Sequence, residues 1–262
     1  MSQTPDYRLL AESAQRRALV VGTLLAVAAA VLLAVLVHIV IGVVVLILFA
    51  AVWGLWVQRA FAGAEEEVLA SLGEPVPEGD LPGLRNALEG VSLLTGVAEP
   101  SIRLIDVERA NAMATASADG ATVVVTSGLI AQGSAVEAEV LAAELLCRIR
   151  DGSARYGTLL AGLPPIMRMA SGISEASFAE LLGEQSALRG DFDAVTVTRY
   201  PPGLIATFER MQDTGTELPE APPATAALWI APAVNPGRGV DESIDRVANQ
   251  PIEYRIAALR EL

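Results

Sequence analysis

Residues 18–57 read ALVVGTLLAVAAAVLLAVLVHIVIGVVVLILFAAVWGLWV, a stretch without a single Asp, Glu, Lys or Arg. One helix across the whole stretch would be about 60 Å long, because a helix rises about 1.5 Å per residue. The hydrocarbon core of a bilayer is only about 30 Å thick, which takes about 20 residues. The stretch therefore predicts two membrane-spanning helices, at about residues 18–37 and 39–57, with the chain reversing near His38.

The charges beside this stretch predict its orientation. Arg16 and Arg17 precede it and Arg59 follows it, whereas the expected turn near His38 carries no Arg. Basic residues favour the cytoplasmic side, so both ends of the hairpin and the large C-terminal part are predicted to be cytoplasmic. The run is too long for the apolar region of a cleaved signal peptide, which is about 7–15 residues. We therefore expect a multi-pass protein of a bacterial-type inner (plasma) membrane.

A repeat of small residues lies on one face of the first expected span. It consists of Gly22, Ala26, Ala30 and Ala34. Small residues four apart let a second helix approach closely within a membrane, although the same spacing arises by chance in an Ala-rich helix. This pattern leaves open a structural subunit that acts through its transmembrane hairpin.

The rest of the chain lacks most catalytic side chains. All 18 basic residues are Arg, the single His is His38, and the single Cys is Cys147. A Ser-His-Asp triad, a Cys-His dyad, a Schiff-base Lys and a His-based zinc site are therefore excluded outside the apolar stretch. The formal net charge is −13, and the excess of acid lies in residues 60–262. Such a surface argues against nucleic acid as a partner.

Four regions follow from these patterns. They are a cytoplasmic N-terminal segment at residues 1–17, the two spans at 18–57, a Glu-, Pro- and Gly-rich linker at 58–80, and a domain at 81–262. Helices are expected at residues 81–97, 135–150, 174–198, 201–211 and 252–262. Strands are expected at 101–107, 121–126 and 225–231, with a small-residue loop between the first two. Helices outnumber strands, so the fold class is α+β with a small β-sheet.

Local signals place some of the helix ends. Asp80 is the expected N-cap of the first helix of the domain. Ser134 with Glu137 forms a capping box for the next helix. The helix at residues 174–198 is expected to break near Gly190. Pro164, Pro165 and Arg168 argue against a third membrane crossing at residues 158–173.

Five segments appear in a distinctive order. They read NAMAT at residues 111–115, ATVVVTSGLI at 121–130, EVLAAELLCRI at 139–149, DFDAVTVTRYPPGL at 191–204 and PIEYRIAAL at 251–259. This order resembles membrane-bound zinc metalloendopeptidases of the HtpX and CAAX-prenyl-protease type. The five segments of this chain are similar to five elements of that family. In the same order, these are an Asn-Ala-Phe-Ala-Thr loop, an edge strand, the zinc helix, the segment after the third ligand and the closing helix. The resemblance implies an N-terminal transmembrane hairpin followed by a mostly helical, gluzincin-like peptidase domain.

The resemblance also implies a zinc site, which this sequence has altered. The family places two His ligands on a helix as His-Glu-x-x-His, with the Glu as general base and a downstream Glu as third ligand. Ala143 and Cys147 stand at the two His positions here, and Ala187 stands at the third. Glu144 keeps the general-base position, and Asp191 keeps the position of an Asp that orients a ligating His. A catalytic zinc needs three protein ligands, so we expect zinc to be lost and no cofactor to be bound.

The remaining polar residues of this region also have plain structural interpretations. Glu144 and Arg148 are four residues apart, the spacing of a helical ion pair. Cys147 is expected to be a small buried residue, since no base exists to activate it. Asp191 could cap or break the helix near Gly190.

These observations predict a catalytically inactive pseudopeptidase, anchored in the membrane, that binds a protein segment or a membrane partner. In the resembled family a peptide lies along an exposed edge strand by β-augmentation. The residues at that strand here are uncharged: Thr122, Val123, Val124, Val125 and Thr126. They are the predicted peptide-binding strand, unless a loop of the chain itself covers them. By family analogy the role would lie in membrane-protein quality control.

An enzymatic alternative stays open at this point. The metal site could be rebuilt from Cys147, Glu144 and Asp191, with carboxylates from elsewhere in the chain. The protein would then be an active zinc metalloendopeptidase.

Overall fold

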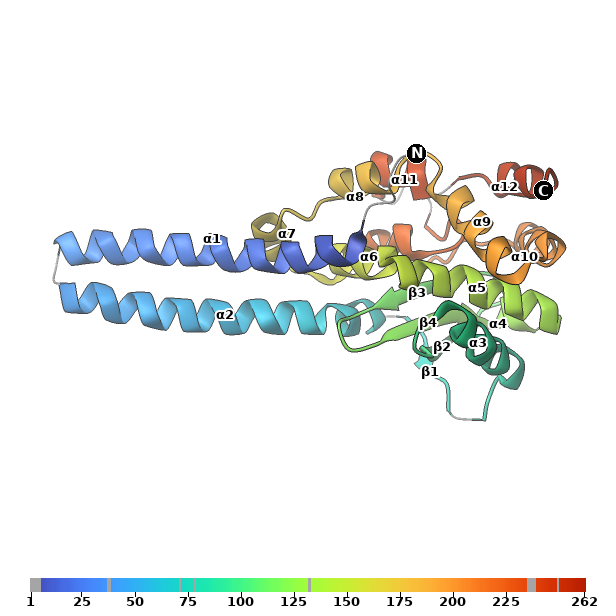
Figure 1. Ribbon diagram of the computed structural model, residues 1–262, viewed down its shortest axis with the longest axis horizontal. Helices are drawn as coiled ribbons and strands as arrows, with labels where there is room; N and C mark the ends of the chain where they lie inside the picture. The colour runs from blue at the N-terminus through green and yellow to red at the C-terminus, as the bar shows by residue number, and fades with distance from the viewer. Residues whose placement is uncertain are drawn as a thin grey trace.

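The computed structural model of the 262-residue chain describes all of it except residues 1–5, 37–38, 71, 78, 132, 235–238 and 249. Two long helices lie side by side, and they project from a domain in which helices surround one small sheet (Figure 1). The predicted α+β class, mostly helical with a small β-sheet, is confirmed. His38, the predicted site of chain reversal, lies outside the described residues.

The helices have the following bounds. They are α1 Tyr7–Leu36, α2 Ile39–Leu69, α3 Pro82–Thr95, α4 Ser127–Ile130, α5 Ala135–Asp151, α6 Ser153–Gly162, α7 Pro165–Ser171, α8 Glu175–Leu182, α9 Ser186–Thr198, α10 Pro201–Thr214, the 3-10 helix η1 Pro223–Leu228, α11 Glu242–Ala248 and α12 Ile252–Leu259. The strands are β1 Glu74–Pro75, β2 Ser101–Ile105, β3 Ala112–Ala116 and β4 Ala121–Thr126.

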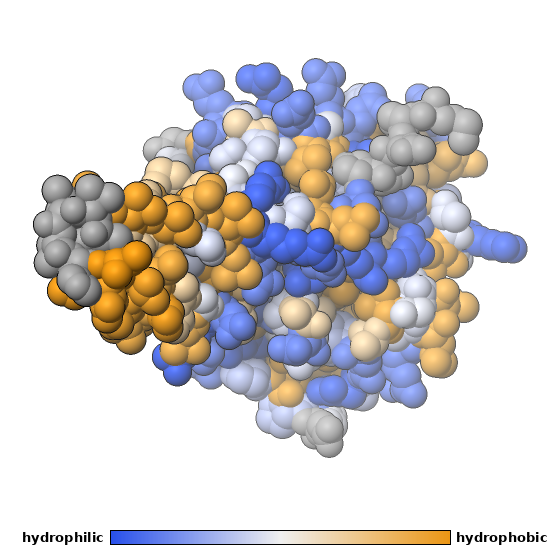
Figure 2. All heavy atoms as spheres, turned by 60° about the vertical axis from the view of Figure 1, so that its left-hand side comes forward, coloured by the Kyte–Doolittle hydropathy of each residue, from blue (hydrophilic) through white to orange (hydrophobic). Residues whose placement is uncertain are grey.

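The hairpin of α1 and α2 carries both expected spans. Each helix is long and apolar enough to cross a membrane. Large apolar side chains face outward along it, such as Leu24 at 64% and Val52 at 69% exposure. Figure 2 shows this apolar surface projecting from a domain whose own surface is largely polar. That surface is typical of contact with lipid.

Both helices continue past the expected spans into the domain. The predicted linker at 58–80 is wrong in its first half, because α2 runs on to Leu69 and only residues after it are irregular. Residues 58–69 are rich in Ala, Glu and Leu, which favour helix. The predicted N-terminal segment is likewise part of α1 from Tyr7 onward. These extensions bury Tyr7, Ala11, Ala64 and Val68 in the same apolar core as α6 and α8.

The small-residue repeat on α1 packs inside the hairpin. The indole Nε1 of Trp53 on α2 donates a hydrogen bond to the carbonyl oxygen of Ala18 at 3.0 Å. A Cβ built on Gly22 would fall within the Trp53 ring, so only glycine fits there. Ala26 and Ala30 are also buried, at 1% and 7% exposure. The described part of the repeat, Gly22, Ala26 and Ala30, is therefore buried, and at Gly22 it contacts the chain's own second helix.

The sheet has the strand order β1-β2-β4-β3. β2 and β4 are parallel, whereas β3 and β4 are antiparallel, with Met113 opposite Val124. The segment expected as a loop between the first two strands is β3, and a tight turn with Ser117 N donating to Gly120 O leads into β4. β4 therefore pairs on both sides, and the prediction that residues 122–126 form an edge strand is wrong.

Three other local expectations are corrected by the structure. The helix at residues 174–198 breaks at Gly183, whose φ of 74° ends α8, and it continues unbroken through Gly190. Residues 225–231 form η1 and one isolated bridge, at Trp229, where a strand was expected. Leu81, with φ 54°, stands at the N-cap of α3 where Asp80 was expected, and Pro82 begins the helix.

Candidate functional site

The helix at the zinc-helix position lies at the centre of the domain. Its start is fixed by Ser134, whose Oγ accepts a hydrogen bond from the backbone N–H of Glu137 at 3.2 Å, as the capping box predicts. The middle of α5 is buried, including Ala143 and Glu144 at 0% and Cys147 at 3% exposure. These three positions share one face of the helix, because residues three and four apart are neighbours.

The other two positions of interest come from α9, which packs against α5. Ala187 and Asp191 are buried on it, at 4% and 0% exposure. Gly190 allows the close approach, since a Cβ built there would lie 3.4 Å from Oε1 of Glu144. The fold thus brings together on two packed helices the five positions that the sequence singled out.

Arg148 holds the carboxylate of Glu144. Oε1 of Glu144 accepts hydrogen bonds from Nε of Arg148 at 3.0 Å and from Nη2 at 2.7 Å. Nη1 of Arg148 donates to the carbonyl oxygen of Trp229 at 3.1 Å, so the guanidinium is fixed on both sides. The predicted ion pair is confirmed. No hydrogen bond within the described structure reaches the other carboxylate oxygen, Oε2, which is buried.

A second arginine, which the sequence reasoning missed, holds Asp191. Arg255 of α12 is fully buried and binds both carboxylate oxygens of Asp191, with Nε–Oδ2 at 2.8 Å and Nη2–Oδ1 at 2.5 Å. Its guanidinium lies 4.2 Å from the ring centroid of Phe208 and 3.8 Å from Oε1 of Glu144. The predicted role of Asp191 as a helix cap or break is wrong, because it sits within α9.

A signal for Arg255 was present in the sequence. The buried face of α12 consists of Ile252, Arg255, Ile256 and Leu259. Arg255 therefore falls on an apolar helical stripe, where a charged side chain needs a buried partner of opposite charge. The stripe alone could predict a buried arginine, although it does not name the partner.

Cys147 is buried in this region as a neutral thiol. Burial is the main reason that its pKa is raised to about 12. The nearby carboxylate of Glu144 acts in the same direction, whereas Arg150 acts against it. Zinc and electrophiles react with the thiolate, and this environment disfavours the thiolate. The expectation of a small buried residue is confirmed.

The side chains present do not fit a catalytic zinc ion. Ala143 and Ala187 carry no donor atom, Oε1 of Glu144 is bound by Arg148, and both oxygens of Asp191 are bound by Arg255. Among the described residues, no three His, Cys, Asp or Glu side chains gather in a way that could hold a metal. The positive charge beside the two carboxylates comes from two guanidinium groups.

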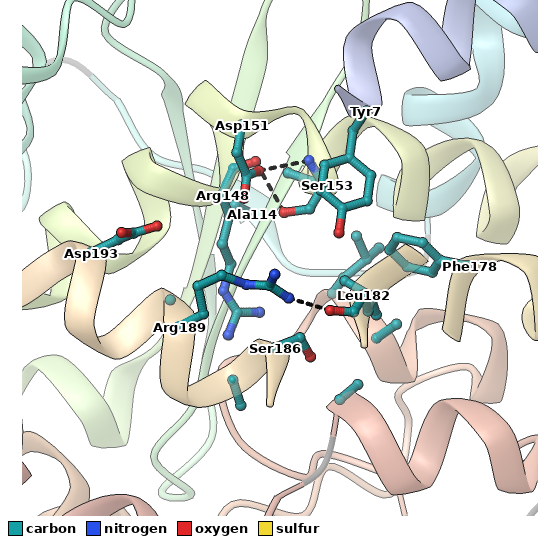
Figure 3. Close-up of a pocket in the computed structure, with 16 residues that line it drawn as sticks. Tyr7, Ala114, Arg148, Asp151, Ser153, Phe178, Leu182, Ser186, Arg189 and Asp193 are labelled. Atoms are coloured by element: carbon teal, nitrogen blue, oxygen red, sulfur yellow. Dashed lines mark hydrogen bonds between the residues drawn. The ribbon is translucent and has the colours of Figure 1, made fainter. Parts of the chain in front are cut away.

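A small cavity lies beside this cluster. Figure 3 shows Tyr7, from the first turn of α1, pointing into it, while Arg189 reaches across to the carbonyl of Leu182. The Tyr7 hydroxyl donates to the carbonyl oxygen of Leu181 at 3.0 Å. The cavity is about 50 Å³, well below the roughly 300–1,000 Å³ of ordinary ligand pockets. It holds water-sized molecules and no peptide.

The outer strand of the sheet is also covered by the chain itself. All five residues of β3 are buried. Ile230 N donates to Ala112 O at 2.8 Å, and Oγ1 of Thr158 accepts from Ala116 N at 3.1 Å. A peptide could pair with this edge only after the segment around Trp229 had moved away. The structure places neither β4 nor β3 where a peptide could add a strand directly.

The chain has relatives among known proteins. A protein named "Protease HtpX homolog" from Dictyoglomus thermophilum is 27% identical over 236 residues, covering 77% of this chain and 76% of the relative. A protein of the same name from Tropheryma whipplei is 26% identical over 252 residues, covering 83% and 85%. The chain is similar to HtpX-type proteases. This likeness supports the resemblance seen in the sequence and a peptidase-family fold.

Two further comparisons gave nothing. No family model matches the chain, and no solved structure matches it. The HtpX-like character therefore rests on the curated relatives and on the motifs.

Proposed function

We propose that this HtpX-like chain is a membrane-anchored pseudopeptidase, which has lost zinc-dependent hydrolysis and acts by binding a protein segment or a membrane partner. One observation carries the proposal. Glu144 stands at the general-base position, buried, with Oε1 bound by Arg148, and the adjacent ligand positions Ala143 and Ala187 offer no donor. A catalytic zinc needs three protein ligands and an open position.

The electrostatics of the cluster support the same conclusion. A general base in hydrolysis must accept a proton from a water molecule held close to it. Oε1 of Glu144 lies 2.7 Å from Nη2 of Arg148 and 3.8 Å from Nη2 of Arg255, so two guanidinium groups occupy the space beside it where such a water would have to sit. The adjacent cavity of about 50 Å³ leaves no room for a peptide bond to approach.

The rebuilt metal site, the enzymatic alternative, finds less support. Its three candidate ligands were Cys147, Glu144 and Asp191. The thiol of Cys147 has a pKa of about 12, and both oxygens of Asp191 are bound by Arg255. A metal ion would have to displace both arginines and deprotonate the thiol.

The proposed location is a bacterial-type inner membrane, with the domain in the cytoplasm. Arg16, Arg17 and Arg59 flank the apolar hairpin at its domain end. Trp53 and Trp56 lie near the same end and contact each other, with ring centroids 5.3 Å apart. Arginine next to a span favours the cytoplasmic side, and tryptophan is typical of either membrane interface.

The test compares the native chain with a variant in which the family's zinc ligands are restored. The full chain is purified in detergent, dialysed against zinc, and assayed for bound metal and for cleavage of an unfolded protein substrate. The variant carries Ala143→His, Cys147→His, Ala187→Glu and Arg148→Ala. We expect zinc only in the variant, because it alone has three ligands and a free Glu144.

Two outcomes would contradict the proposal that peptidase activity has been lost. Stoichiometric zinc in the native chain, with cleavage abolished in Glu144→Gln, would make it an active peptidase. Chelator-sensitive cleavage lost in Cys147→Ser would show a rebuilt metal site.

A further inference from the structure

A short helix of the domain, α7, exposes two large apolar side chains. α7 follows Pro164 and reads PIMRMAS at Pro165–Ser171. Met167 faces inward and is fully buried, whereas Met169 is 79% exposed and Ile166 is 48% exposed. Leu93 and Leu94 of α3 are exposed to a similar degree, at 82% and 67%, so it is the position of α7 that sets its exposed face apart.

The position of α7 along the molecule supplies a reason. α7 packs against α1. A Cβ built at Gly172, directly after α7, would lie 3.4 Å from Nη1 of Arg17. In Figure 1, α7 is the domain helix that lies farthest along the hairpin. It therefore sits at the height where the apolar span begins, just after Arg17.

Two other features mark that height as a membrane boundary. The indole of Trp53 binds the carbonyl oxygen of Ala18, the residue that follows Arg17. Tryptophan is enriched at the level of the lipid headgroups, because its ring is apolar and its N–H is polar. Aromatic rings, arginine and the exposed face of α7 thus lie at the same level.

The charges around α7 fit a phospholipid surface. The Arg17 guanidinium donates to the carbonyl oxygen of Ser13 at 3.4 Å and to its Oγ at 3.3 Å, and no carboxylate of the described structure pairs with it. It is exposed and can reach a phosphate group. Arg168 of α7 is paired with Glu175 at 2.8 Å, which neutralises that acid.

We propose that α7 lies in the headgroup region of the membrane that the hairpin crosses, with Ile166 and Met169 inserted among the upper acyl chains. This inference rests on the proposed membrane anchoring and adds a contact made by the domain. A helix in the interfacial plane buries its apolar face at the boundary of headgroups and chains. Together with the hairpin it would fix the tilt of the domain against the membrane.

Fluorescent labels at single cysteines test this proposal. Cys147→Ser removes the only native cysteine, and a cysteine is then introduced by Met169→Cys, Leu24→Cys or Leu93→Cys. Each is labelled with an environment-sensitive dye in the full chain, which is reconstituted into vesicles of phosphatidylethanolamine and phosphatidylglycerol. Leu24 lies in the span, and Leu93, on α3, is 82% exposed and matches Met169. The vesicles also contain lipids brominated near the headgroup, which quench the fluorescence of a dye that lies close to them.

The expected result is quenching at positions 24 and 169, with none at 93. If the label at position 24 is quenched but the label at 169 is as unquenched as the label at 93, α7 does not contact the membrane. The proposed anchoring by the hairpin would still stand in that case. A shielded but unquenched label at 169 would assign α7 to a protein partner and also overturn its contact with the membrane. Absence of quenching at 24 would refute the membrane anchoring itself.

Discussion

Glu144 and Asp191 each meet an arginine from a different part of the chain. Arg148 lies one turn further along the same helix as Glu144, whereas Arg255 comes from the closing helix. A buried carboxylate is tolerated only when it is paired, because desolvation costs several kcal/mol. In this cluster each of the two buried acids is paired with an arginine.

The first prediction concerns Arg148. Arg148→Met leaves the Glu144 carboxylate buried beside an apolar side chain, so we expect a loss of about 3–5 kcal/mol in the free energy of unfolding. Adding Glu144→Gln removes the charge and should recover much of the loss. Denaturant unfolding in detergent micelles measures both. Equal losses in the single and the double variant would contradict the importance of the pair.

The second prediction concerns Cys147. Its pKa of about 12 means that the folded chain holds a neutral thiol at pH 8, which iodoacetamide alkylates slowly. The folded pKa lies above the unfolded value of about 8.5, so this thiol lowers the free energy of unfolding as pH rises from about 8.5 to 12. Mass spectrometry with and without urea measures the protection. The reactive control is the Cys147→Ser chain with an exposed cysteine introduced by Met169→Cys. Equal alkylation rates for this cysteine and for Cys147, both measured without urea, would refute the prediction.

Local spacing predicted part of this cluster and could not predict the rest. The pair of Glu144 and Arg148 follows from helical spacing alone, whereas the burial of Cys147 was expected because no base exists to activate it. Arg255 and Asp191 are 64 residues apart, and their contact depends on how α12 packs against α9. The general-base position was thus recognised from the motif, whereas the group that neutralises Asp191 was not.

At the scale of the element, the sheet shows why strand order is harder to predict than strand content. Residues 122–126 of β4 are all β-branched, and the segment was recognised as a strand. The segment of β3 is mostly Ala, which has low strand propensity, and it was read as a loop. Reading β3 as a loop left one side of β4 apparently free, so the peptide-binding edge strand that the resemblance implies was assigned to β4.

A third prediction tests the helix contact within the hairpin. In Gly22→Ala the new methyl group occupies the space of the Trp53 ring, so the indole must move and lose its hydrogen bond to Ala18. We expect a lower melting temperature and a shift in tryptophan emission. Gly54→Ala on the facing helix is the control, since nothing lies within 4 Å of its new Cβ. An unchanged emission spectrum in Gly22→Ala would contradict the close packing.

At the scale of the whole molecule, the hairpin and the domain share one core. Tyr7, Ala14 and Val57 belong to the same apolar cluster as Phe178 and Trp229. A Cβ built on Gly162 of α6 would lie only 2.0 Å from the carbonyl oxygen of Ala64, so α6 and α2 are in direct backbone contact. The domain that the sequence predicts at residues 81–262 is therefore incomplete by itself.

The fourth prediction follows from this shared core. A fragment of residues 81–262 lacks α1 and α2 and exposes the apolar surface that they cover. We expect it to bind the dye ANS strongly and to self-associate, because large exposed apolar patches drive association. Size-exclusion chromatography and dye fluorescence measure this against the full chain in detergent. A monomeric fragment that binds no dye would show that the domain folds alone.

The contact between Tyr7 and Leu181 also bears on how the protein is made. The two residues are 174 positions apart, and the tyrosine hydroxyl receives its acceptor only when that later segment has been synthesised. A ribosome releases the first helix long before it releases α8. The first turn of α1 is thus synthesised long before α8, yet this contact can form only after α8 has emerged.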